Sequence, residues 1–121
     1  MLNLNHKKLD VYRIGLELVR EIYNLTSKFP KSEIYGLTNQ MRRAAVSIVS
    51  NIAEGSARKS LKDRIRFYEV SRSSLVEIDA QIEIAILLNF CASTDLNILD
   101  EKLNHLFAKL CRLIQKQDEG A

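Results

Sequence analysis

Residues 40–58 read QMRRAAVSIVSNIAEGSAR, and their apolar and polar side chains alternate with helical spacing. Small and branched apolar residues recur every three or four positions, so they occupy one broad face of an α-helix. These residues are Met41, Ala44, Ala45, Ile48, Val49 and Ile52. A narrow polar stripe lies opposite and contains Gln40, Arg43, Ser47, Ser50, Asn51, Glu54 and Arg58. We predict a helix over residues 35–57 that neighbouring helices cover on more than one side.

Three further stretches, residues 9–28, 60–89 and 94–117, show the same periodicity. Pro30 cannot continue a helix and therefore separates the first stretch from the second. Ser60 and the acidic residue three positions later resemble a capping box at the start of the third. The triplet Ser93-Thr94-Asp95 is typical of the start of a fourth helix. Since the breaks are short, we predict one all-α domain over residues 1–121, an antiparallel up-down-up-down four-helix bundle.

The last stretch contains a regular leucine seam with steps of three and four residues. Its members are Leu96, Leu99, Leu103, Leu106, Leu110 and Leu113. Such a seam can join two chains in a coiled coil or close the bundle of one chain. Because three other amphipathic stretches accompany it, we favour the second interpretation.

Composition is that of an ordinary globular protein, with 121 residues, 46% apolar residues and a net charge of +3. No apolar run approaches the roughly 18 residues that a membrane span needs. The first ten residues lack the apolar core of a secretion signal, so we expect a cytoplasmic protein without a membrane partner. Cys91 and Cys111 belong to no paired motif, and we expect both to be reduced, half-buried helix residues.

Positive charge concentrates between Arg42 and Arg72, where eight basic residues face three acidic ones. An excess of this kind attracts phosphate groups or an acidic partner. The alternative is a solvated helix surface with ordinary ion pairs, and the charge pattern alone leaves both interpretations open.

Residues typical of catalysis are missing from the sequence pattern. The four glycines are isolated and form no phosphate-binding loop. Glu101 and His105 are four residues apart and occur once, whereas a di-iron bundle needs two Glu-x-x-His pairs. The serines have no evident histidine base. We therefore expect no enzymatic activity, no catalytic residue, no metal and no cofactor.

The stretch 40–58 strongly resembles the signature of the bacterial 23S ribosomal RNA intervening-sequence proteins. Leu9-Asp10-Val11-Tyr12, Phe29-Pro30, Tyr35-Gly36-Leu37 and Ser74-Leu75 with Glu77 match further features of that family. The resemblance covers roughly residues 6 to 115. Val49 stands where the family usually has proline, and Tyr12 where it commonly has tryptophan. The first exchange removes an expected kink from the second helix.

The resemblance implies a four-helix bundle that assembles into a homopentamer, and it supplies no catalytic residue. The family genes lie in insertions within 23S ribosomal RNA genes, which points to an RNA-related role. Members are also similar to the basic accessory protein of diversity-generating retroelements, which works with a reverse transcriptase and nucleic acid.

The leading hypothesis is therefore a non-enzymatic, oligomeric bundle that binds RNA or a ribonucleoprotein. Its candidate contact residues are Arg42, Arg58, Lys59, Lys62, Arg64 and Arg66. The alternative is a structural or protein-interaction scaffold without a nucleic-acid role. Arg43, Asn51 and Glu54 are expected to form a structural polar stripe, in which Arg58 or Arg43 neutralises Glu54.

Overall fold

The computed structural model describes residues 1–120 and contains four α-helices. Their bounds are α1 Asp10–Thr26, α2 Leu37–Ser56, α3 Leu61–Leu87 and α4 Asn97–Glu119. Three short 3-10 helices, η1 Asn5–Lys8, η2 Lys31–Glu33 and η3 Ser93–Asp95, precede α1, α2 and α4. No strand is present in the described part of the chain, which confirms the all-α prediction.

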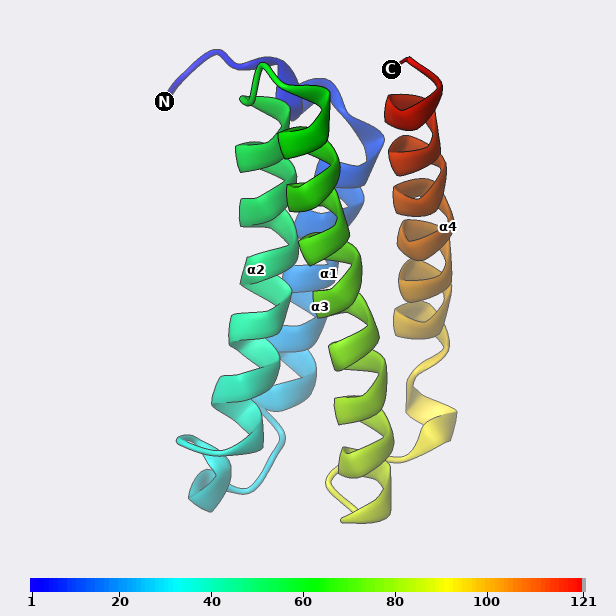
Figure 1. Cartoon of the computed structure of the whole chain (residues 1–121). Coiled ribbons are helices and arrows are strands. Elements are labelled where there is room, and N and C mark those ends of the chain that lie inside the picture. Colours follow the sequence, from blue (N-terminus) through cyan, green and yellow to red (C-terminus); the bar gives the residue numbers. More distant parts are fainter. Residues whose placement is uncertain (121) are drawn as a thin grey trace.

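The four helices form an antiparallel bundle in which each helix runs opposite to the next (Figure 1). Helix α1 packs against α2 and α4, and α3 packs against the same two helices, with the most extensive contact between α2 and α3. The α2–α3 connection therefore lies at the same end of the bundle as η1 and the C-terminal part of α4 (Figure 1). None of the helices within residues 1–120 is both long and apolar enough to cross a membrane.

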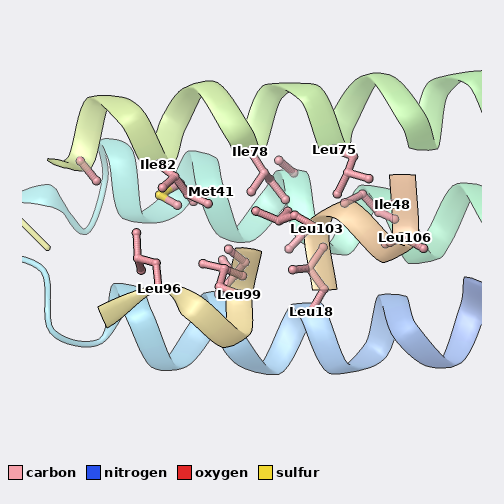
Figure 2. Close-up of a cluster of buried hydrophobic side chains, with 14 of the residues drawn as sticks. Leu18, Met41, Ile48, Leu75, Ile78, Ile82, Leu96, Leu99, Leu103 and Leu106 are labelled. Atoms are coloured by element: carbon pink, nitrogen blue, oxygen red, sulfur yellow. The ribbon is translucent and has the colours of Figure 1, made fainter. Parts of the chain in front are cut away.

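The core runs along the bundle axis and receives side chains from all four helices (Figure 2). Leu18, Met41, Ile48, Ile78 and Leu106 are fully inaccessible to solvent. The first five residues of the leucine seam are buried, so this seam closes the bundle of its own chain, as favoured above. At the end of α4 the buried position moves from Leu113 to Ile114. A straight helix has 3.6 residues per turn, so it drifts away from a strict seven-residue repeat.

Two helix ends agree with the sequence prediction in part. Ser60 caps α3 as predicted, because its hydroxyl accepts a hydrogen bond from the Asp63 backbone N–H at 3.3 Å. Helix α3 stops at Leu87, before the predicted limit, and Asn89 adopts the left-handed conformation at φ 61°. The Phe90 N–H then reaches the Ala85 carbonyl at 2.9 Å, which completes a Schellman-type end.

The prediction that Ser93-Thr94-Asp95 starts the fourth helix is wrong. These residues form η3, whose N–H groups bond back to the residue three positions earlier, as Asp95 does to Ala92 at 3.0 Å. Leu96 leaves the helical region at φ −112° and ψ 12°, so α4 begins at Asn97. Cys91 is half-buried as expected but lies in this connection rather than in a helix, and burial raises the pKa of its thiol.

Small and polar residues bring α2 and α3 close together. A Cβ on Gly55 would lie 2.9 Å from the Tyr68 ring, so glycine permits this approach. Ser71 is buried and donates a hydrogen bond to the Ile48 carbonyl of α2 at 2.8 Å, while the Ser74 hydroxyl contacts that of Ser47 at 3.1 Å. Buried hydroxyls without partners would cost stability, and these serines all have one.

Two ion pairs join α1 to α4, and both involve carboxylates of α1. Lys102 contacts Glu17 at 2.9 Å, and Lys109 contacts Asp10 at 3.3 Å. Hydrogen bonds from Arg13 and Lys109 lower the pKa of Asp10, and the hydrogen bond from Lys102 lowers that of Glu17. A carboxylate with a lowered pKa stabilises the folded state above its ordinary pKa and loses this contribution as pH falls through the folded value.

We expect acidification from pH 7 to below about 4 to lower the melting temperature of the protein, partly because these carboxylates become protonated. A Lys102→Met/Lys109→Met variant lacks the lysine of each ion pair but keeps the contact of Arg13 with Asp10, so its melting temperature should depend less steeply, though still measurably, on pH across the same interval. Differential scanning calorimetry at several pH values measures both curves. If the melting temperature depends on pH equally in the two proteins, the two ion pairs do not contribute to the acid sensitivity, which would contradict this prediction.

Candidate nucleic-acid interface

Five of the six predicted contact residues gather where α2 passes into α3. We call this group the basic end, and it consists of Arg58, Lys59, Lys62, Arg64 and Arg66. Two of them lie between the helices, and the other three lie in the first two turns of α3. Short connections at bundle ends are solvated, so long cationic side chains remain available there.

An aromatic ring positions two of these cations. The guanidinium groups of Arg58 and Arg66 lie over the Phe67 ring, 4.8 and 4.9 Å from its centroid. Arg58 also contacts Glu54 at 2.7 Å, and Arg66 lies 4.0 Å from Asp63. Both arginines are held by cation–π contact and remain partly exposed, with side-chain exposures of 43% and 67%.

The other three residues of the basic end divide into one anchor and two free charges. Arg64 is half-buried, and its Nε donates to the Arg58 carbonyl at 2.6 Å, which ties the connection to α3. Lys59 and Lys62 are exposed and make no ion pair within residues 1–120. These two ammonium groups are therefore available to an anionic partner.

Arg42, the sixth predicted contact residue, lies outside the basic end. It belongs to the first turns of α2, at the opposite end of the bundle. Its guanidinium lies 4.5 Å from the centroid of the Tyr23 ring, and its Nε donates to the Thr26 hydroxyl at 2.9 Å. Both partners belong to the last turn of α1, where cations interact favourably with the helix dipole. Arg42 thus connects α2 to the C-terminal end of α1.

The predicted polar stripe does not act as one network. Asn51 is half-buried and donates a hydrogen bond to the Ser47 carbonyl within α2 at 2.8 Å. Its amide also contacts the Ser47 hydroxyl, which in turn contacts the Ser74 hydroxyl of α3. Glu54 pairs with Arg58, the first of its two predicted partners. Arg43 is three turns away, is exposed, and makes no ion pair within the described residues.

The exposure of Glu54 determines how much its ion pair contributes. Its side chain is 53% exposed, so water screens the contact with Arg58. Exposed helical pairs at this spacing contribute about 0.3–0.5 kcal/mol. We expect Glu54→Ala to change the free energy of unfolding by less than about 0.5 kcal/mol, measured by urea denaturation. A decrease of more than about 2 kcal/mol in the free energy of unfolding would contradict this and would indicate that Glu54 contacts another subunit.

Charge is polarised along the whole bundle. The half nearest the α2–α3 connection comprises residues 1–18, 47–74 and 109–120, with twelve Lys and Arg against seven Asp and Glu. The other half, residues 19–46 and 75–108, has six against eight. The antiparallel topology brings both terminal segments to the basic half, so the positive electrostatic potential extends beyond the basic end itself.

Six basic residues of this half lie outside the contiguous segment from Arg42 to Arg72 and were therefore not predicted as part of the site. Arg13 and Lys109 pair with Asp10, and the other four are Lys7, Lys8, Arg112 and Lys116. Helix η1 packs on α2, and the last turns of α4 reach the same end (Figure 1). These residues could have been found from the predicted up-down topology, because it places both chain termini beside the α2–α3 connection.

Within residues 1–120, no three His, Cys, Asp or Glu side chains are grouped so that they could hold a metal ion. The arrangement at the basic end is instead a set of cations on a solvated surface.

Comparison with known families agrees with this architecture. The family model described as 23S rRNA-intervening sequence protein matches residues 7–112. The chain belongs to this family. No curated protein matches it. The matched part of the chain includes the whole basic end and most of the four-helix core.

Proposed function

We propose that this member of the family is a cytoplasmic, non-enzymatic bundle that binds the RNA backbone through its basic end. One observation supports this most strongly: Lys59 and Lys62 are exposed and make no ion pair with any residue from 1 to 120, and they lie beside two arginines that a phenylalanine holds in place. Positioned cations of this kind neutralise phosphates and release counterions, which favours binding without base recognition.

The aromatic residues of this region support backbone recognition rather than base recognition. Tyr68 is buried, and its hydroxyl bonds to Ser56 at 2.8 Å. Phe67 is half-buried and already contacts two guanidinium groups. A protein that reads single-stranded bases normally offers free aromatic faces for stacking. We therefore propose that the protein tolerates different RNA sequences.

We also propose that the protein forms a closed homo-oligomer. Large apolar side chains remain exposed on the helices and in the turn before α2, including Val76 of α3 at 56% and Tyr35 of the turn at 93%. Exposed apolar surface of this extent favours association. The number five comes from the family resemblance alone. In a ring, each copy would add its own basic end, so the positive potential would become a continuous band.

Sequencing of RNA that co-purifies with the tagged protein from its native host tests the RNA proposal. We expect RNA to be enriched over a parallel purification of a variant in which Lys59 and Lys62 are replaced by Glu. The identity of the enriched RNA would then name the target. Equal background RNA in both purifications would contradict the proposal and favour the protein-interaction scaffold.

A further inference from the structure

A groove between α3 and α4 combines apolar walls with unpaired carboxylates. Leu75, Val76, Leu103 and Phe107 form the walls of a cavity of about 260 Å³. Asp79 and Asp100 flank it, and neither makes an ion pair within residues 1–120. Such a groove is complementary to a partner surface that has exposed apolar side chains next to a positive charge.

A surface formed by α2, the last turn of α1 and the turn that precedes α2 is of that kind and lies on the same chain; we call it the α1–α2 face. Tyr23, Ile34, Tyr35 and Val46 are exposed along a shallow groove of about 600 Å³. Arg43 lies in the same groove without an ionic partner in the described residues. The two grooves share no residue, so one copy of the protein can use both at once.

The charged groups of the two grooves lie at corresponding levels along the bundle. In Figure 2, Met41 and Ile82 lie near one end of the view, and Ile48 and Leu75 lie further along the bundle, a register that the hydrogen bond between Ser47 and Ser74 also indicates. Arg43 lies between the two α2 positions, and Asp79 lies between the two α3 positions. Two copies standing side by side with parallel axes would therefore bring Arg43 of one to the level of Asp79 of the other without an axial shift.

We propose that the α3–α4 groove receives the α1–α2 face from a second copy of this chain. This inference rests on the proposed homo-oligomer and specifies its interface. Arg43 of one copy faces Asp79 and Asp100 of the next, while the exposed tyrosines and Val46 pack against Val76 and Phe107. Because the contact joins two different surfaces, it is heterologous and repeats from copy to copy until a ring closes.

This arrangement has a consequence for the basic end. Copies that pack side by side with parallel axes point the same end of each bundle in the same direction. All basic ends then lie on one side of the assembly, where several copies can contact one RNA. The interface residues lie away from Lys59 and Lys62, so assembly and RNA binding can be measured separately.

Charge reversal and its repair test the interface. The first variant is Arg43→Glu, the second is Asp79→Lys/Asp100→Lys, and the third combines all three changes. Like charges across the contact oppose association, so we expect each of the first two to raise the protomer concentration at half-assembly at least about tenfold. The combined variant restores opposite charges and should recover the mass of the wild-type oligomer. Light scattering coupled to size-exclusion chromatography measures the mass.

Glu83→Lys/Glu101→Lys is the matched control, because both residues are exposed acids of the same two helices outside the groove. It should assemble like the wild type, and circular dichroism should give equal helix content for all variants. A wild type of 13.9 kDa in solution would overturn the oligomer proposal together with this interface. A wild-type oligomer that both reversals leave intact, or that the combined change does not restore, would overturn the interface alone.

Discussion

The triple variant Lys59→Glu/Lys62→Glu/Arg66→Glu is expected to lose RNA binding altogether at salt concentrations where the wild type binds. The exchange converts three exposed cations of the basic end into three anions, so phosphates are repelled instead of neutralised. Each residue is exposed, and none supplies a core contact, so helix content and oligomer mass should stay unchanged. Fluorescence anisotropy with a labelled RNA measures the loss.

A second triple variant, Arg20→Glu/Lys28→Glu/Lys31→Glu, controls for total charge. These residues are also exposed and free of ion pairs within residues 1–120, but they lie in the acidic half of the bundle. It has the same net charge as the first variant and should retain most of the RNA affinity. Equal losses for the two variants would mean that overall charge, rather than the basic end, determines binding.

Leu106→Ala is expected to lower the free energy of unfolding by about 2–5 kcal/mol. Leu106 is fully buried among side chains of several helices in the central layer (Figure 2), so its removal loses apolar burial and leaves a cavity. Urea denaturation at one fixed protomer concentration measures the change, because association contributes to apparent stability.

Leu87→Ala provides the matched control for this substitution. Leu87 ends α3 and is 77% exposed, so the same chemical change should cost less than about 0.5 kcal/mol. Similar losses at both positions would contradict the assignment of the core. A clear difference would support the packing in which the leucine seam of α4 closes the bundle of its own chain.

The helices and their buried faces could be predicted because apolar spacing reports directly on burial. Met41, Ile48 and Ile52 recur at helical intervals, and all three are fully buried. The start of α4 could not be predicted in the same way. Ser93, Thr94 and Asp95 favour helix starts in general, but a short 3-10 turn uses the same residues, and only tertiary packing selects between the two.

The candidate site was predictable in part for a related reason. Residues of one connection are neighbours in space, so Arg58, Lys59 and Lys62 lie together as expected. Arg42 belongs to the same sequence segment but lies at the far end of α2, about 24 Å from Arg58 at 1.5 Å per residue. Its contacts with Tyr23 and Thr26 depend on the pairing of α1 with α2, which charge counting does not consider.

The salt dependence of RNA affinity, measured on the purified wild-type protein, is the decisive test of RNA-backbone binding through the basic end. Anisotropy titrations with labelled polyuridine and polyadenosine would cover about 50 to 200 mM monovalent salt. For three to five phosphate contacts on a single strand, we expect RNA affinity to fall roughly 20- to 130-fold across this interval, with similar values for both RNAs. A wild-type protein that binds neither RNA at the lowest salt concentration would rule out this mode of binding.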